Sequence, residues 1–113
     1  MNPKFEIDFL EDARLFLLSL NEKARGKLIY NIDKAKQHND PKLFKKLNGD
    51  IWEFRAESMK LQYRLLAFWD KRDGKKTLVI CTHGFIKKQD KVPAGEIEKA
   101  QKIMKIYFEQ YLY

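Results

Sequence analysis

The spacing of apolar residues changes twice along the chain, from a helical period to an alternating one and back to a helical one. The segment Phe5–Phe9 is predicted to be a short strand. A helix is predicted to begin near Glu11 or Asp12 and to run to about Leu20. The high apolar content of this first helix indicates burial on more than one side.

A second helix is predicted to follow, with Asn21 as its N-cap. Its apolar residues fall on one stripe, and its basic residues lie on the flanks of that stripe. The stripe consists of Ala24, Leu28, Ile32 and Ala35, and the flanks carry Lys23, Arg25, Lys27, Lys34 and Lys36. The two helices are expected to form a hairpin.

The middle third of the chain alternates between apolar and polar residues. After a break at residues 39–41, a short helical turn is predicted for Lys42 to Lys46. Three consecutive antiparallel strands are then predicted at Ile51–Ala56, Leu61–Trp69 and Thr77–Lys87. This part of the chain should therefore form a meander.

The last predicted helix begins after Pro93. Its broad apolar face, suited to packing on the sheet, consists of Ile97, Ala100, Ile103, Met104, Tyr107, Phe108 and Tyr111. The elements predict an α+β fold with the order β-α-α-β-β-β-α, in which an N-terminal helical hairpin packs on a small, mostly antiparallel sheet. Because 113 residues provide one compact core, residues 1–113 are predicted to be a single domain.

The charge of the chain favours an anionic partner. It has 23 Lys and Arg residues against 16 Asp and Glu residues, a formal net charge of +7 and a pI of about 9.5. Such a balance attracts polyanions, and nucleic acid is the first candidate. Many small soluble proteins are basic without binding nucleic acid, so the placement of the charges has to decide.

The number and spacing of cysteine and histidine residues exclude disulfide-linked and metal-binding classes of protein. The single cysteine, Cys81, cannot form an internal disulfide, and Cys and His do not occur at metal-ligand spacing. No metal or other cofactor is therefore expected. The first residues lack the apolar run of a signal peptide and no stretch approaches membrane-spanning length, so we expect a cytoplasmic protein without membrane contact.

Alternation along the strands determines which side chains share a face of the predicted meander. With four-residue hairpin loops, Glu53 lies opposite Arg64 and Arg55 opposite Gln62, while Cys81 lies beside Arg64. One end of this face is polar, with Glu53, Arg55, Gln62, Arg64, His83, Phe85 and Lys87, and the other end is apolar, with Leu66, Phe68 and Val79. The polar end collects residues from three strands.

These polar residues suit the cleavage of RNA through its own 2′-hydroxyl. That reaction needs a group that removes a proton, cations that stabilise the charge on the phosphate, and an acid for the leaving oxygen. Arg55 and Arg64 suit the phosphate, His83 suits proton transfer near neutral pH, and Glu53 suits either orientation of the histidine or the role of base. Further candidates are Lys87 for catalysis and Phe85, Gln62 and Lys88 for RNA binding.

Each assignment has a plainer alternative. Glu53 and Arg64 could form a surface ion pair of little energetic value. His83 could be a hydrogen-bonded sheet histidine, and Phe85 could serve packing. Gly84 could mark a bulge, which would turn the following residues to the other face.

Three segments of the chain carry short motifs. Residues 46–55 (KLNGDIWEFR) contain L-x-G-x-x-x-E-x-R, residues 63–69 (YRLLAFW) contain Y-R-x-x-x-F-x, and residues 83–88 (HGFIKK) contain H-G-F-x-K-K, followed by Pro93, Glu96 and Ala100. In order and spacing these motifs resemble those of the HigB-like, phage-derived branch of the RelE/ParE toxin superfamily. The resemblance covers roughly residues 44–108.

This resemblance implies a RelE-like fold and ribosome-dependent mRNA cleavage by the toxin of a type II toxin–antitoxin pair. It also implies a cognate antitoxin, typically a helix-turn-helix protein that binds operator DNA. By position, Arg55, Arg64, Lys87 and Lys88 match the basic residues expected around the scissile phosphate. Some relatives use an aromatic hydroxyl near the end of the chain, for which the candidates are Tyr107, Tyr111 and Tyr113.

Two other functions stay open at this point. A ParE-like protein with the same fold inhibits DNA gyrase, so the fold alone does not identify the activity. A non-catalytic remnant would only bind an antitoxin, and the apolar patch of Leu66, Phe68 and Val79 would suit that contact or would be covered core. The basic cluster on the strands favours the nuclease.

Overall fold

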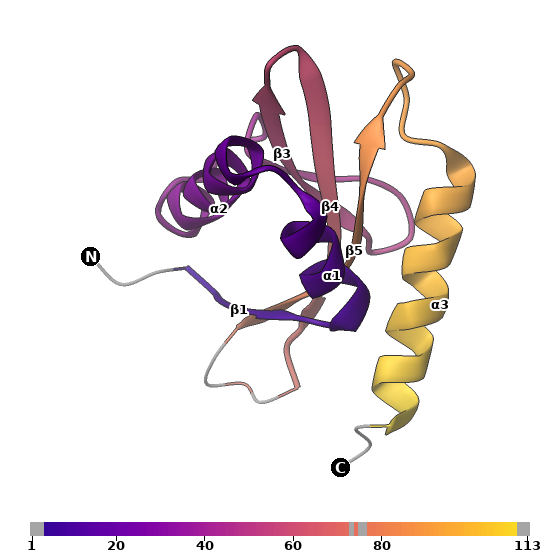
Figure 1. Ribbon diagram of the computed structural model, residues 1–113. Coiled ribbons are helices and arrows are strands. Elements are labelled where there is room, and N and C mark those ends of the chain that lie inside the picture. Colours follow the sequence, from indigo (N-terminus) through magenta and orange to yellow (C-terminus); the bar gives the residue numbers. More distant parts are fainter. Residues whose placement is uncertain (1–3, 73, 75–76, 111–113) are drawn as a thin grey trace.

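The computed structural model describes residues 4–72, 74 and 77–110, which form one mixed sheet with helices on both faces (Figure 1). In chain order the elements are β1 (Glu6–Phe9), α1 (Glu11–Ser19), α2 (Glu22–Gln37), β2 (Phe44–Lys46), β3 (Trp52–Ser58), β4 (Leu61–Asp70), β5 (Leu78–Lys87) and α3 (Ala94–Gln110). The predicted α+β class is confirmed. No helix among the described residues is both long enough and apolar enough to span a membrane.

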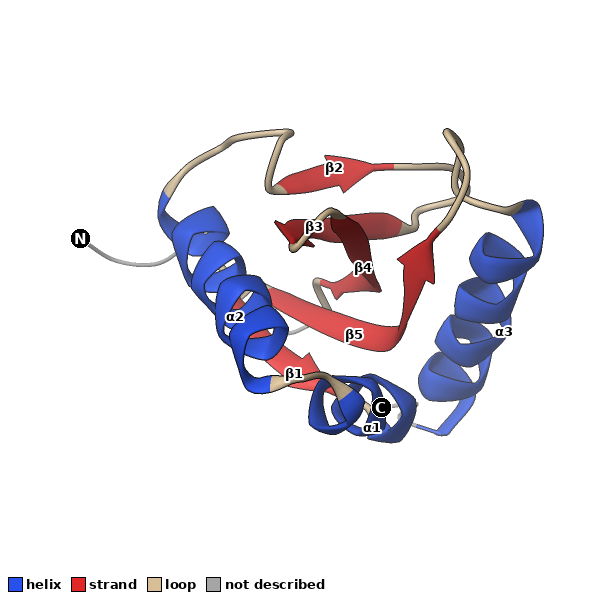
Figure 2. Cartoon of the chain, turned by 45° about the horizontal axis from the view of Figure 1, so that its top comes forward, coloured by secondary structure: helices blue, strands red, loops and turns tan. Residues whose placement is uncertain are grey.

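The sheet has five strands in the order β1-β5-β4-β3-β2. β1 runs parallel to β5, and the other neighbouring strands are antiparallel. Helices α1 and α2 cover one face of the sheet and α3 covers the other (Figure 2). The last strand, β2, forms one edge of the sheet.

The core beneath α1 and α2 contains the apolar stripe predicted for the second helix. Its fully buried residues include Leu28 from α2 and Leu65 from β4. Asn21 caps α2 as predicted, because its side chain accepts a hydrogen bond from the backbone N–H of Ala24 at 2.8 Å. Arg25 donates to the carbonyl of Leu17 at 2.8 Å, which ties the start of α2 to the end of α1.

The core beneath α3 lies on the opposite face. Ile97 and Ala100 of α3 pack there with Leu66, Phe68 and Ile80 of the sheet. The two β4 residues of the predicted apolar patch are therefore covered core and do not form a binding surface. Val79, the third member of that patch, belongs to the other core, so its predicted face was wrong.

The predicted helical turn at Lys42 to Lys46 was wrong. Residues 44–46 form the edge strand β2, which pairs with β3. The reason is an aromatic contact, since the rings of Phe44 and Phe54 stack with centroids 4.1 Å apart. This contact across two strands outweighs the weak local helical pattern.

The predicted register between β3 and β4 was shifted by two residues. The strands are joined by a two-residue turn, Met59 and Lys60, whose φ angles of 50° and 68° are those of the tight hairpin turns that usually contain Asn or Gly. As a result, Glu53 pairs with Leu66 and Arg55 pairs with Arg64. Because side chains alternate with a period of two, the predicted faces of β3 and β4 are nevertheless correct.

The register between β4 and β5 contains a bulge. Leu66 pairs with His83 and its neighbour Ala67 pairs with Cys81, so Thr82 is an extra residue in β5. Upstream of the bulge, Cys81 lies in the core beneath α1 and α2 and not beside Arg64 as predicted. Downstream of the bulge, His83, Phe85 and Lys87 share the face of Arg64. The prediction placed them on this face through a regular register, whereas in the structure the bulge places them there.

The bulge lies at Thr82 and not at Gly84, where the sequence had suggested one. Gly84 instead lies directly against α1. A Cβ atom at this position would come within 2.1 Å of the ring of Phe16. The glycine therefore permits α1 to pack closely on β5.

Candidate functional site

The candidate site is built from cross-strand rows on the α3 side of the sheet. Three rows follow one another along the strands: Glu53, Leu66 and His83; then Arg55, Arg64 and Phe85; then Glu57, Gln62 and Lys87. The first row lies under α3, because His83 contacts Glu96 of that helix. The other two rows reach an open part of the surface, so the sheet brings the predicted site residues together there.

Two arginines and one glutamate form the centre of this surface. Arg55 and Arg64 are direct neighbours on adjacent strands. Glu53 lies between them, with Oε1 3.2 Å from Nε of Arg64 and Oε2 3.7 Å from Nε of Arg55. The predicted surface ion pair is in fact buried, since the side chains of Arg64 and Glu53 are only 2% and 4% exposed.

The two guanidinium groups retain unused hydrogen-bonding capacity. Arg64 donates to the carbonyl of Tyr63 at 3.0 Å, and Arg55 donates to the carbonyl of Pro41 at 3.3 Å. The Nε atoms of both arginines are buried close to the Glu53 carboxylate but form no hydrogen bond within the described part of the chain. The side chain of Arg55 is 30% exposed, so its guanidinium group is the one that an anionic ligand would reach first.

Positive charge exceeds negative charge at this centre. Arg55, Arg64 and Lys87 face Glu53 and Glu57, which leaves one net positive charge. The pKa of Arg64 is lowered, first by burial, against which Glu53 acts in the opposite direction. The pKa of Lys87 is also lowered, first by burial and then by repulsion from Arg64.

An open groove of about 310 Å³ runs over the part of β3 that extends beyond β2, beside the arginine pair. Its walls include Arg55 and Arg64, and also three residues that the sequence analysis did not include: Lys27 and Asn31 of α2, and Lys42. The amide of Asn31 donates to the carbonyl of Arg55 at 2.9 Å and thereby holds α2 against this edge. The two lysines raise the net charge around the groove to three positive charges.

One sequence signal could have pointed to this edge. Asn31 is 8% exposed and interrupts the otherwise apolar buried positions of α2. A buried amide needs a hydrogen-bond partner, and an unpaired strand edge offers one. The two lysines gave no comparable signal, because exposed lysines are common on helices and loops.

His83 lies apart from the open groove. Its ring is 2% exposed, with Nε2 3.0 Å from Glu96 Oε1 and Nδ1 3.1 Å from Thr82 Oγ1. Burial lowers its pKa, and the hydrogen bond to Glu96 opposes that shift. These contacts correspond to the plainer alternative for His83, a hydrogen-bonded histidine of the sheet that here also anchors α3.

The other predicted residues are distributed around the arginine pair. Phe85 is partly buried against the core beneath α3, with its ring centroid 6.4 Å from that of His83. Gln62 donates to Glu57 Oε1 at 2.5 Å, and Lys88 is exposed just after the end of β5. The structure thus keeps Gln62 at the groove, whereas Phe85 has a packing role at its margin.

Of the three candidate tyrosines, only Tyr107 is described, and Tyr111 and Tyr113 lie outside the described residues. The hydroxyl of Tyr107 donates to Asp70 Oδ2 at 2.8 Å, near the opposite end of β4 from Arg64. Burial, followed by this hydrogen bond, raises the pKa of Tyr107 to about 12. Tyr107 is therefore part of the packing of α3 and does not face the groove.

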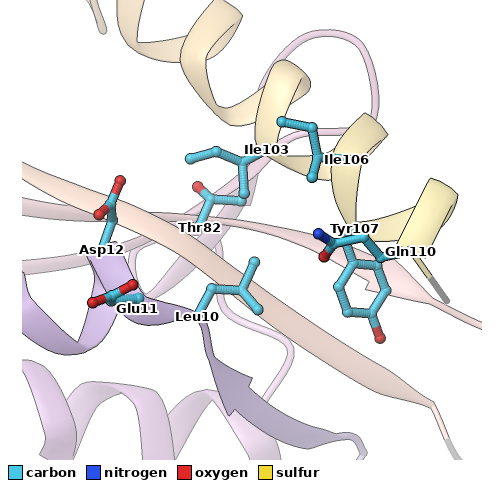
Figure 3. A pocket seen from close by; sticks show the side chains of 8 residues that line it. All are labelled: Leu10, Glu11, Asp12, Thr82, Ile103, Ile106, Tyr107 and Gln110. Atoms are coloured by element: carbon cyan, nitrogen blue, oxygen red, sulfur yellow. The ribbon is translucent and has the colours of Figure 1, made fainter.

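A different groove, of about 290 Å³, lies between the start of α1 and the second half of α3 (Figure 3). Its walls are largely apolar, with Leu10, Ile103 and Ile106 among them, and Glu11 and Asp12 stand at one side. Of the candidate residues that the structure describes, only Tyr107 lines it, and none of the basic ones does. The candidate site is therefore the basic groove at the edge of β3.

The fold and the site define a class. A mixed sheet with α1 and α2 on one face and α3 on the other is compatible with a RelE-like fold, and its basic groove is typical of proteins that bind an anionic partner. Residues 15–105 match the model of the phage-derived Gp49-like protein family (DUF891), and the chain belongs to this family, which is toxin-like and related to RelE. A search of curated proteins found no match.

Proposed function

We propose that the protein is the toxin of a type II toxin–antitoxin pair, a HigB-like endoribonuclease that cleaves mRNA on the ribosome without a metal ion. Its partners would be translated mRNA and a cognate antitoxin, of the helix-turn-helix class that the resemblance implies. Membership in a toxin-like family supports the general assignment. The arrangement of Arg55 and Arg64 supports the specific one.

The arginine pair is the observation that carries the proposal. Like charges directly opposite each other on neighbouring strands repel, and Glu53 compensates for only one of the two. A phosphodiester held across both guanidinium groups would compensate for the other. A protein that inhibits gyrase only by binding to it does not need paired cations around one buried carboxylate.

The geometry also suggests a role for each side chain. Arg64 and Arg55 would bind the scissile phosphate and stabilise the charge that develops on it, while Glu53 holds them in place and would accept the proton of the attacking 2′-hydroxyl. Lys87, whose pKa is lowered, suits proton donation to the leaving 5′-oxygen. Gln62 and Lys88 would contact the flanking RNA. His83, enclosed between Thr82 and Glu96, is not included in this scheme.

The experiment is translation-coupled mRNA cleavage, with the cuts mapped by primer extension in a reconstituted bacterial translation system. Arg64→Lys is the best variant, because it keeps a charge beside buried Glu53 but removes the planar guanidinium. We expect it to lower cleavage by about 100-fold or more, as for the loss of a transition-state donor. The matched control is Lys102→Ala on the exposed side of α3, which should cleave like the wild type.

Two outcomes would reject the nuclease. Equal cleavage by the wild type and Arg64→Lys would remove the arginine pair from the reaction. An intact transcript with a folded wild-type protein that arrests growth would favour the gyrase alternative, which a supercoiling assay would then examine. A folded protein that neither cleaves RNA nor arrests growth would favour the non-catalytic remnant.

A further inference from the structure

A further groove, called the second groove below, lies at the other end of β2 from the arginine pair. Its volume is about 560 Å³, and three of its walls are aromatic: Trp52 at the start of β3, Trp69 near the end of β4, and Phe108 of α3. Two lysines, Lys46 and Lys71, and one carboxylate, Asp50, are also part of its wall. The groove thus combines aromatic rings with a small excess of positive charge.

The two tryptophan rings are partly exposed members of an aromatic cluster that also contains Phe5 and Phe44. Trp52 and Trp69 are perpendicular to each other, with centroids 5.6 Å apart and an interplanar angle of 75°. The ammonium group of Lys71 lies 5.3 Å from the ring centroid of Trp69. A base that stacked on this ring would displace the ammonium group of Lys71, which would then lie close to the phosphate of the same nucleotide.

Strand β2 connects this second groove with the arginine groove. Lys42 lines the arginine groove, Lys46 lines the second groove, and Lys45 is exposed between them. β2 is the last strand of the sheet, at its edge (Figure 2).

We propose that a single-stranded RNA passes around the outer edge of β2, with one phosphate on Arg55 and Arg64 on the α3 face and a base stacked against Trp52 and Trp69, which lie on the opposite face of the sheet. The inference rests on the proposed function and extends it, because it defines a second contact with the substrate. The two contacts lie at opposite ends of β2, because Trp52 pairs with Lys46 and Arg55 follows the partner of Phe44. Short RNAs would reach only one of them.

The chain contains a built-in probe for this contact. Its two tryptophans, Trp52 and Trp69, both line the second groove, so intrinsic fluorescence reports on that groove alone. The ligands are a 12-nucleotide and a 3-nucleotide single-stranded RNA, both 2′-O-methylated so that they cannot be cleaved. The variant is the double substitution Lys46→Ala and Lys71→Ala, which changes two exposed side chains, and the control is Lys102→Ala.

The long RNA should quench tryptophan emission, and the short RNA, bound mainly at the arginine pair, should not. The double substitution should weaken binding of the long RNA about tenfold, and it should lower the slope of log Kd against log salt by about 1.4, as expected for two lost phosphate contacts on a single strand. Binding of the short RNA should stay the same. The control should match the wild type with both ligands.

The assay separates failure of this proposal from failure of the proposed function. Binding of the long RNA that depends on Arg64 but neither quenches tryptophan nor depends on Lys46 and Lys71 would overturn the β2 path and leave the nuclease intact. Both conclusions come from binding alone and do not require a cleavage assay. A change of tryptophan emission with protein concentration in the absence of RNA would indicate a second copy of the chain in the groove and would also overturn the proposal.

Discussion

Replacement of Gly84 by alanine places a methyl group against the ring of Phe16. A Cβ atom at this position would lie 2.1 to 2.6 Å from three ring atoms, so the ring or the strand would have to move by about 1.5 Å to reach ordinary van der Waals contact. Overpacking of this kind costs about 1–3 kcal/mol. For a chain of this size that corresponds to a fall in Tm of roughly 4–12 °C.

In the Phe16→Ala background, the expected effect of Gly84→Ala on the free energy of unfolding changes sign. Without the ring, the methyl group has space, and alanine within a strand is about 0.5–1 kcal/mol more favourable than glycine because it loses less backbone entropy on folding. Gly84→Ala should therefore destabilise the wild type and slightly stabilise the Phe16→Ala variant. Urea unfolding of the wild type, the two single variants and the double variant at 25 °C measures both effects in one cycle.

Equal destabilisation by Gly84→Ala in both backgrounds would refute the reasoning. It would mean that the ring of Phe16 is not the obstacle and that α1 does not pack on β5 as described. Because Gly84 lies between His83 and Phe85, the same variants should also be assayed for mRNA cleavage. A stable double variant with lost cleavage would show that the position of α1 matters for the site.

Three further predictions concern stability. Arg72 lowers the pKa of Asp70 to about 2 from an ordinary value of 3.8, so Asp70→Asn should cost about 2 kcal/mol at neutral pH. In urea titrations from pH 7 to 2 this difference should be constant above about pH 5 and should largely disappear as the pH falls towards 2. Asn21→Ala removes an N-cap and should lower the free energy of unfolding by about 1 kcal/mol in thermal or urea unfolding. Replacing Met59 and Lys60, both at positive φ, with Asn-Gly should raise it by about 1 kcal/mol, and an unchanged Tm would contradict the described turn.

Alternation along β3 and β4 was enough to predict that Glu53, Arg55, Gln62 and Arg64 share a face. The predicted register was wrong by two residues, because nothing in the Met59 and Lys60 pair indicates a tight turn with positive φ. An error of two residues leaves the faces unchanged, so the site could be predicted even though its pairs could not.

Contacts between distant segments could not be predicted from local patterns. The strand β2 depends on the stacking of Phe44 on Phe54, and the wall of the groove depends on Lys27 and Asn31 of α2 reaching the edge of β3. Helical periodicity identifies which side of α2 is buried but not which strand edge lies nearby. The enclosure of His83 likewise depends on where α3 crosses the sheet.

The bulge at Thr82 makes the site sensitive to the number of residues in β5, and not only to their identity. If the strand kept all its residues but paired regularly from Ala67 and Cys81 onward, without the bulge, the rest of the strand would exchange its two sides. Gly84 and Ile86 would then face the arginine pair, and Lys87 would be turned towards the core beneath α1 and α2. Among descendants of this gene, single-residue insertions and deletions in β5 downstream of the bulge should therefore be purged more strongly than most substitutions there, whereas loss of Thr82 itself would leave the faces unchanged.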